Sequence, residues 1–198
     1  QANLFQDKVV LVTGGGSGIG FAITKQLLQY GATVIISSRK EERLKSAVEK
    51  LSEFGKVRYV VVDIRETDQI EQLSQNIKAF EGKLDILINN AGGQFPSAVE
   101  DISFKGWNAV INNNLNGTFY VTQTIAKHFF IPNKEGNIVN IIANKSEIIN
   151  DLVVLENNAA MLTDSTSDDD ATSIELEQEK EQEKEKEQEG GFVKSHTK

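Results

Sequence analysis

A glycine cluster between an apolar run and a helical pattern is the feature that most constrains this chain. The run at 8–13 (KVVLVT) is short and rich in β-branched residues, which predicts a buried parallel strand. The sequence TGGGSGIG follows at 13–20, and apolar residues then recur at helical spacing until Gly31. We expect a strand, a tight turn and a helix that ends at Gly31. The start of such a helix offers unpaired N–H groups to an anion, so this unit predicts a pyrophosphate site.

Further strands and helices alternate along the chain. Short apolar runs predict four more strands, at 33–37, 57–62, 84–88 and 137–142. Helical patterns occupy the intervals, at 41–54, 67–80, 103–114 and 115–130. Strands that alternate with helices at this spacing form right-handed βαβ units. The sequence therefore predicts an α/β fold of the doubly wound (Rossmann) type with a mostly parallel sheet.

The composition changes after the fifth predicted strand. Residues 1–163 carry 16 Lys and Arg against 17 Asp and Glu, whereas 164–189 carry 3 Lys against 12 Asp and Glu. The run at 174–189 is a Glu, Gln and Lys repeat with helix propensity and almost no apolar face. We expect residues 1–150 to form a dinucleotide-binding Rossmann domain, truncated after the fifth strand. Residues 151–198 then form an acidic tail, either largely disordered, a solvated helix or a segment that binds a partner.

Charge and composition exclude several classes of function. The first 163 residues are close to neutral, whereas binding to nucleic acid or to an anionic membrane needs a concentrated positive field. There is no cysteine, and the two histidines, His128 and His196, lie far apart in sequence, so we predict no metal site. No apolar run approaches the roughly 20 residues that cross a bilayer, and we therefore expect no membrane span.

Nothing in the sequence places the chain in one cellular compartment. We expect a soluble protein, and the cytoplasm, the mitochondrion and the peroxisome all stay open. The C-terminal residues 196–198 are His-Thr-Lys, which differ from the Ser-Lys-Leu address of peroxisomal proteins. That address signal is therefore missing.

The end of the second predicted strand bears on which dinucleotide is bound. In NAD-binding units an acidic residue at this point accepts a hydrogen bond from the ribose 2′-hydroxyl. This sequence has Ser37-Ser38-Arg39-Lys40 there, and an arginine can pair with a 2′-phosphate. The residues therefore predict NADP(H) as the cofactor. The alternative is that Arg39 and Lys40 only begin a solvated helix.

A carboxylate also follows the third predicted strand. Asp63 and the backbone N–H of Ile64 stand where an adenine edge can be hydrogen-bonded. The alternative role of Asp63 is to cap the next helix. We therefore predict that this pair of residues contacts the adenine.

Three motifs in this chain resemble those of the short-chain dehydrogenase/reductase family. They are TGGGSGIG at 13–20, NNAG at 89–92 and NLNG at 114–117, and their order and spacing match the family through Ile142. The stretches SRK, ERL and NNAGGQF, at 38–40, 42–44 and 89–95, look most like the NADPH-dependent enoyl-CoA and dienoyl-CoA reductases of fatty-acid metabolism, including the peroxisomal type.

The resemblance implies a role for each matching position. Asn114 matches the family's helix asparagine, which holds a water of the proton relay; its alternative role is to kink or cap the helix. The implied cofactor contacts are Gly14, Ser17, Gly18 and Ile19 with Gly20 at the diphosphate, Arg39 at the 2′-phosphate, Asp63 and Ile64 at the adenine, and Asn90, Ala91 and Gly92 beside the adenosine ribose.

The chain departs from the family at the catalytic pair. Most members use a tyrosine as the proton donor or acceptor and a lysine four residues later that lowers its pKa. Tyr30, Tyr59 and Tyr120 are the only tyrosines here, and none has a lysine four residues on. Ser146 is the nearest candidate for the family's catalytic serine, but its surroundings (NKSE) match poorly, and we interpret it as a loop residue. We therefore expect this chain to be catalytically incomplete.

Two functions fit these observations. The first is an NADP(H)-dependent oxidoreductase that reduces an enoyl-CoA-like fatty acyl substrate, of which this chain is an incomplete form. The second is a non-catalytic dinucleotide-binding or scaffold subunit. The family's last two strands have no counterpart in the sequence, so the fifth strand becomes a sheet edge. We expect that a protein partner covers this edge.

Overall fold

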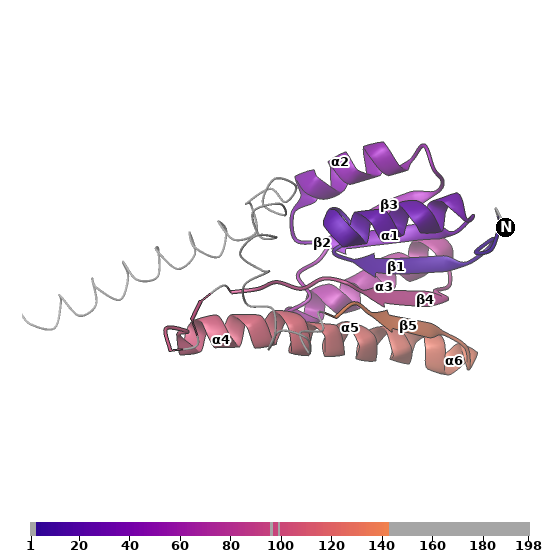
Figure 1. Ribbon diagram of the computed structural model, residues 1–198. Coiled ribbons are helices and arrows are strands. Elements are labelled where there is room, and N and C mark those ends of the chain that lie inside the picture. Colours follow the sequence, from indigo (N-terminus) through magenta and orange to yellow (C-terminus); the bar gives the residue numbers. More distant parts are fainter. Residues whose placement is uncertain (1–2, 96, 99, 143–198) are drawn as a thin grey trace, which may run out of the picture. The chain divides into compact units, whose positions relative to one another are not determined.

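The structure, a computed structural model, describes residues 3–95, 97–98 and 100–142 (Figure 1). Within these ranges, strands and helices alternate as in an α/β fold. The predicted tail at 151–198, the candidate Ser146 and the last residues of the predicted 1–150 domain lie outside the described residues.

The described strands form one parallel sheet in the order β3-β2-β1-β4-β5. They are β1 (Val9–Thr13), β2 (Thr33–Ser38), β3 (Val57–Val61), β4 (Ile86–Asn89) and β5 (Asn137–Asn140). Val10 of β1 lies opposite both Val34 of β2 and Ile86 of β4, so the chain winds outward from β1 in both directions. This order confirms the predicted doubly wound fold. Ligands of such sheets bind beyond the carboxyl ends of the strands at the switch point, which here lies between β1 and β4.

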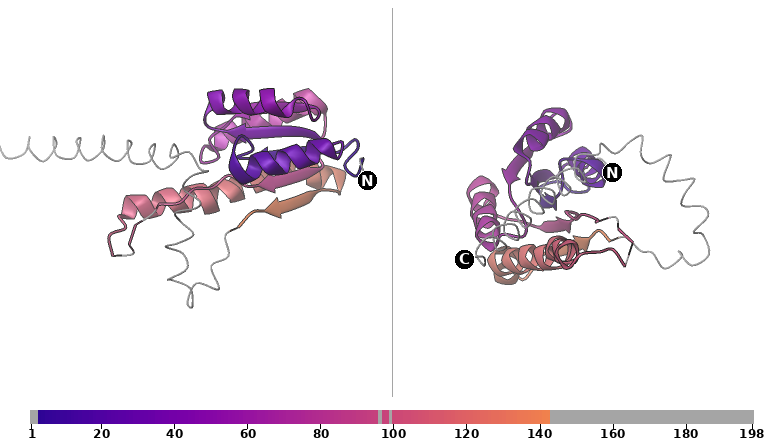
Figure 2. Two further views of the ribbon diagram at one scale, coloured as in Figure 1. Left: turned by 45° about the horizontal axis from the view of Figure 1, so that its top comes forward. Right: turned by 90° about the vertical axis from the view of Figure 1, so that its left-hand side faces the viewer.

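Helices cover both faces of the sheet (Figure 2). Two of them, α1 (Gly18–Gln29) and α2 (Glu41–Leu51), pack on one face, and α3 (Thr67–Glu81) packs on the other together with the helical stretch after residue 103. Gly82 ends α3 in a left-handed conformation with φ 71°, which glycine adopts without strain. In the described part of the chain, no helix is long and apolar enough to cross a membrane.

The helical stretch after β4 is continuous, whereas the sequence predicts two helices with Pro132 beyond them. It consists of α4 (Phe104–Ile111), the π-helical turn η1 (Asn112–Asn116), α5 (Gly117–Ile125), the π-helical turn η2 (Ala126–Phe130) and α6 (Ile131–Asn133). Pro132 therefore lies in the last turn instead of following it. The helix ends one residue after the proline, and Lys134 follows in a left-handed conformation with φ 54°.

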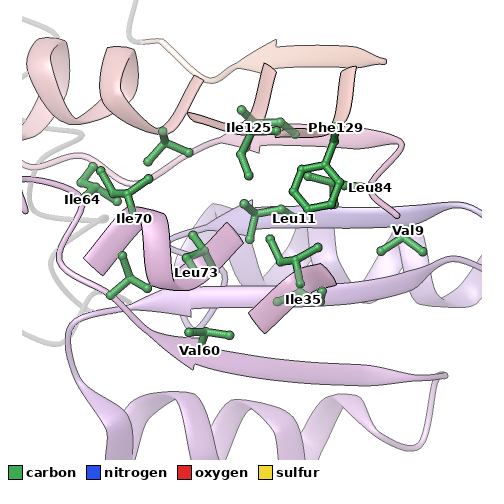
Figure 3. Close-up of a cluster of buried hydrophobic side chains, with 14 of the residues drawn as sticks. Val9, Leu11, Ile35, Val60, Ile64, Ile70, Leu73, Leu84, Ile125 and Phe129 are labelled. Atoms are coloured by element: carbon green, nitrogen blue, oxygen red, sulfur yellow. The ribbon is translucent and has the colours of Figure 1, made fainter. Parts of the chain in front are cut away.

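Apolar side chains fill both faces of the sheet because successive strand residues point to opposite sides. Leu11 and Ile35 contribute to a cluster with α3 and α5, which Figure 3 shows with Leu73, Ile125 and Phe129. Their neighbours in the strands contribute to a second cluster with α1 and α2, which includes Val10, Ile36, Leu28 and Leu44. The two clusters hold the strands that carry the site in fixed register.

A partly buried carboxylate joins the amino ends of the central strands. Asp85, just before β4, accepts the backbone N–H of Val9 at 2.8 Å, and its carbonyl accepts the N–H of Asn137 at 3.0 Å. Lys83 and Lys8 lie 3.2 and 3.5 Å from its carboxylate. Burial raises the pKa of Asp85, but the Val9 N–H and the two lysines outweigh this effect, so the pKa lies below its ordinary value. Asp85 therefore remains ionised while it ties β1, β4 and β5 together.

The last strand of the described sheet, β5, is exposed along its whole length. It pairs with β4 through Leu87 opposite Ile138, and all four of its residues are exposed. Ile138 and Val139 point to opposite faces of the sheet and are 42% and 45% exposed. The predicted position of the fifth strand, at a sheet edge, therefore agrees with the described topology.

Candidate functional site

The glycine turn after β1 is in close contact with the loop after β4. Gly14 has φ 66°, and its N–H donates to the Ser37 carbonyl of β2 at 2.7 Å. A Cβ on Gly14 would lie 2.9 Å from Asn90 Nδ2. A Cβ on Gly20 would lie 2.5 Å from the same atom and would also overlap the Gly14 carbonyl oxygen. No residue larger than glycine therefore fits at either position without moving the loop after β4.

The start of α1 is exposed, as the predicted anion site requires. Ser17, Gly18 and Ile19 are exposed, and Ile19 keeps 64% of its surface. The Ser17 side chain makes no capping hydrogen bond, and the first N–H groups of a helix lack partners within it. A Cβ on Gly18 would meet no atom within 4 Å, and its φ is 51°. The backbone here is accessible to a ligand on the side where its N–H groups carry positive partial charge.

Thr13, a residue that sequence reasoning missed, links the glycine turn to the NNAG loop. Its buried hydroxyl oxygen accepts the backbone N–H groups of Asn90 and Ala91, each at 3.0 Å, and donates to the Ile88 carbonyl at 3.4 Å. In return the Asn90 side chain donates to the carbonyls of Thr13 and Gly14, at 3.0 and 3.3 Å. The predicted cofactor residue Asn90 is therefore part of the wall of the site through its contacts with the turn. The signal that marks Thr13 is its place directly before the glycines.

The carboxyl end of β2 presents two serine hydroxyls and an arginine. The Oγ atoms of Ser37 and Ser38 are buried and have no hydrogen-bond partner among the described residues. Arg39 follows them and is exposed, and within the described ranges it forms no ion pair. Buried hydroxyls in native proteins nearly always have a partner. The Ser38 hydroxyl and the Arg39 guanidinium can both donate to an oxygen of an added group.

The loop after β3 brings Asp63 and Ile64 to the same edge, but the Asp63 carboxylate is already bonded. It accepts Arg65 Nη2 at 2.7 Å and the Arg65 backbone N–H at 3.0 Å. Burial raises the pKa of Asp63, but the hydrogen bonds and charge of Arg65, together with the charge of Arg39, lower it below the ordinary value. The Ile64 side chain is buried beneath α5, where a Cβ on Gly117 would approach it to 2.8 Å.

Asn114 joins the long helical stretch to the loop after β4. It lies in η1, and its Nδ2 donates to the carbonyls of Gly93 and Val110, at 2.8 and 2.9 Å. Its Oδ1 accepts the Gly93 N–H at 3.1 Å, and a Cβ on Gly92 would lie 2.6 Å from this oxygen. The structure therefore places Asn114 and Gly92 in contact. The relay-water role of Asn114 stays a prediction.

A further asparagine, which sequence reasoning also missed, links the end of β4 to α5 and β5. Asn89 is 4% exposed, and its Nδ2 donates to Thr122 Oγ1 of α5 and to Asn140 Oδ1 of β5, each at 2.9 Å. Its place as the first residue of NNAG is the signal for it. Asn89 fixes the end of β4 between the long helical stretch and β5.

The residues of this site gather at one edge of the sheet. The glycine turn, Ser38 with Arg39, the loop of Asp63, and the NNAG loop follow β1, β2, β3 and β4 respectively (Figure 1). Parallel strands end at the same edge, so four segments separated in the sequence form one continuous wall. In the described part of the chain, no group of three or more acidic or histidine side chains is placed to hold a metal ion. This fold and this wall define an α/β protein of the dinucleotide-binding class.

Comparison with known proteins identifies the family within this class. A family model described as short chain dehydrogenase matches residues 8–155. The chain therefore belongs to the short-chain dehydrogenase family of oxidoreductases, whose members bind a nicotinamide dinucleotide. The resemblance that the three motifs indicate is confirmed.

Proteins similar to this chain act on different substrates according to their names. The chain is 36% identical over 140 residues to the "Probable 2,4-dienoyl-CoA reductase" of Bacillus subtilis (strain 168), an alignment that covers 70% of this chain and 55% of the relative. It is 39% identical to the gluconate 5-dehydrogenase of Gluconobacter oxydans (strain 621H), with coverage of 70% and 54%. A crystal structure of actinorhodin polyketide ketoreductase with NADPH has a TM-score of 0.67 and 33% identity, with coverage of 69% and 52%. The chain spans about half the length of the curated relatives it matches.

Proposed function

We propose that this chain binds NADP(H) along the wall at the carboxyl ends of β1 to β4. In this proposal it is an NADP(H)-dependent oxidoreductase of the short-chain type that acts on an enoyl-CoA-like fatty acyl substrate, and the 198-residue chain is itself catalytically incomplete. NADP(H), when bound, supplies or accepts the hydride. The residues of the chain hold and orient the dinucleotide.

The buried, unpartnered hydroxyl of Ser38 beside Arg39 is the observation that carries the preference for NADP(H). A 2′-phosphate at this position would pair with the exposed Arg39 guanidinium, and it would accept the Ser38 hydroxyl once that side chain turns out of its buried position. The 2′-hydroxyl of NAD(H) lacks the two negative charges that attract the arginine. No carboxylate stands at the end of β2 itself to accept that hydroxyl.

The glycine turn supports the same proposal at the diphosphate. The exposed backbone at Ser17, Gly18 and Ile19 approaches an anion without side-chain obstruction, because a Cβ on Gly18 would meet nothing within 4 Å. Gly14 and Gly20 keep the turn against Asn90, so the start of α1 has a fixed direction. Ala91 and Gly92 continue this wall toward the adenosine ribose.

Titration with reduced dinucleotides tests the cofactor proposal. The dissociation constants of NADPH and NADH are measured from nicotinamide fluorescence for the 198-residue chain, for Arg39→Glu, and for Lys50→Glu as a control. Lys50 is exposed at the far end of α2, so its variant carries the same charge change at a remote site. We expect tighter binding of NADPH than of NADH, lost in the Arg39 variant and kept in the control. Equal affinities for the two dinucleotides would exclude the proposed preference.

The proposed substrate class rests on the resemblance of the stretches at 38–40, 42–44 and 89–95 and on the name of the Bacillus relative. Isothermal titration of the chain, saturated with NADP⁺, compares a trans-2-enoyl-CoA with free coenzyme A and with gluconate. We expect heat of binding with the enoyl-CoA alone. Binding of gluconate instead would assign the chain to the chemistry named for its Gluconobacter relative.

The positions of the tyrosines support the proposed catalytic incompleteness. The Tyr59 hydroxyl donates to Glu41 of α2 at 3.1 Å, Tyr30 packs edge-on to Phe5, and Tyr120 packs against the apolar core. None has a lysine four residues later. We expect the purified chain to bind NADPH without oxidising it in the presence of an enoyl-CoA, and turnover in a stopped assay would refute this.

A second candidate function is a non-catalytic dinucleotide-binding or scaffold subunit. The exposed outer edge of β5, with Ile138 and Val139 each more than two-fifths exposed, favours it, because strand edges bind other chains through their backbone groups. Native mass spectrometry of the protein isolated from its source measures this. A stable complex with a second protein supports a scaffold, and free monomer alone speaks against it.

A further inference from the structure

Both oxygens of the Asp63 carboxylate accept hydrogen bonds from Arg65 of the same loop. Oδ1 accepts the Arg65 backbone N–H and Nε, each at 3.0 Å, and Oδ2 accepts Nη2 at 2.7 Å and Nε at 3.1 Å. The single Nε–H is shared between the two oxygens, so three N–H groups of Arg65 engage both oxygens of a carboxylate that offers about four lone-pair sites. The Asp63 backbone N–H donates to Gln69 Oε1 at 2.8 Å. Arg65 therefore engages both oxygens of Asp63 before any ligand binds.

Two arginines flank this single carboxylate. Arg39 ends β2, which is the neighbour of β3 in the sheet, and its positive charge acts on Asp63 closely enough to lower the pKa of that carboxyl group. The Asp63 side chain is 16% exposed, and that of Arg65 is 34% exposed. Besides Arg65, Arg39 is a cation whose charge lowers the pKa of Asp63.

We propose that Arg65 is a specificity-determining residue, which neutralises Asp63 by a two-pronged ion pair and so leaves Arg39 available to the 2′-phosphate of NADP(H). The proposal rests on the proposed function, since it concerns the same end of the same site. An unpaired carboxylate here either draws Arg39 away from the phosphate or repels the phosphate directly. Asp63 and Arg65 together thus determine whether Arg39, at the end of β2, discriminates between the two dinucleotides.

The first test removes the positive charge of Arg65 and keeps most of the length of the side chain. For the 198-residue chain and for Arg65→Gln, the ratio of the NADH to the NADPH dissociation constant is measured by nicotinamide fluorescence. We expect the variant to lose roughly ten-fold in this ratio, which corresponds to one unit charge acting over several ångströms near the protein surface. Because both dinucleotides carry the same adenine, a general loss of binding leaves the ratio unchanged.

Two further variants separate neutralisation from direct contact with the cofactor. Arg65→Lys keeps a cation beside Asp63, and we expect it to retain the ratio within roughly three-fold although it loses the planar fork. The double variant Asp63→Asn with Arg65→Gln removes both charges, and we expect it to recover the NADPH preference. Failure of the double variant to recover would overturn the proposal, because a residue that itself binds the phosphate is not replaced by removing a second charge.

The outcomes distinguish this proposal from the one on which it rests. A wild-type chain that binds both dinucleotides equally overturns both. A wild-type chain that prefers NADPH, with an Arg65→Gln variant that keeps the preference, overturns the role of Arg65 alone. Thermal unfolding of each variant, together with its NADH affinity, shows that the changes in the ratio come from folded protein.

Discussion

Replacement of Thr13 by valine removes the hydroxyl that links the glycine turn to the NNAG loop. Valine has nearly the same shape, so the variant creates no cavity, but two N–H groups, of Asn90 and Ala91, lose their acceptor. A buried donor without a partner costs about 1–3 kcal/mol. Because both amides are only partly buried, we expect the lower end of the range for each and a total of about 2–3 kcal/mol in the free energy of unfolding.

Urea denaturation of Thr13→Val and of Thr24→Val measures this cost against a matched control. Thr24 is also fully buried, and its hydroxyl donates one bond, of 2.8 Å, to the Gly20 carbonyl within α1. Loss of that bond leaves no buried donor unpaired, so we expect a cost below about 1 kcal/mol. A thermal scan should show Thr13→Val unfolding roughly 6 °C below the wild type.

The effect of Thr13→Val on dinucleotide affinity tests the linking role of Thr13 more specifically than its effect on stability does. Thr13→Val should weaken NADPH and NADH alike, because the hydroxyl fixes the turn and does not distinguish a 2′-phosphate from a hydroxyl. Thr13→Ser keeps the hydroxyl and should restore most of the affinity. If Thr13→Val destabilises no more than Thr24→Val, the two amides find other partners and the linking role of Thr13 is wrong.

Three more substitutions probe the wall and its supports. Gly20→Ala should abolish dinucleotide binding and lower the unfolding temperature, because its Cβ meets the backbone of the glycine turn; scanning fluorimetry with and without NADPH records both. Asn114→Ala removes three hydrogen bonds, two to Gly93 and one to Val110, and should cost about 1 kcal/mol in urea because the Asn114 side chain is exposed, whereas Asn116→Ala removes one hydrogen bond, to Asn112, and should cost under about 0.5 kcal/mol. The pKa of Asp85 is lowered in the folded state, so the stability it contributes is present above its ordinary pKa of about 3.9 and is lost as the pH falls through the lower folded value. Asp85→Asn should therefore unfold with a weaker dependence on pH below about 4, measured by acid titration of circular dichroism.

The order and type of the elements around the site follow from the sequence. The strands predicted at 33–37 and 57–62 end within one residue of β2 and β3. Short β-branched apolar runs bounded by turns are typical of buried strands in a parallel sheet, so their limits are visible in the sequence. The glycine turn is also predicted correctly from the sequence. The structure gives the reason for two of its glycines, because a Cβ at Gly14 or Gly20 would overlap Asn90. Local pattern thus determines the edge at which the site lies.

Contacts across the loops do not follow from local pattern. The sequence predicts an Asp63 carboxylate that faces a ligand, but it contains no sign that Arg65, two residues later, folds back onto it. It also predicts a boundary near Asn114, where the structure has a π-helical turn held by Gly93. Both depend on distances between side chains and backbone groups that only the folded arrangement fixes. The same holds for the unpartnered hydroxyl of Ser38.

The bonds of Thr13 also make two amide protons into reporters of a distant segment. The N–H groups of Asn90 and Ala91 exchange with solvent only when they separate from an oxygen 77 and 78 residues earlier in the chain. A dinucleotide that braces the glycine turn therefore slows exchange at the end of β4, whether or not it touches those amides. Hydrogen exchange at these two positions thus follows occupancy of the cofactor site even in a chain that performs no chemistry.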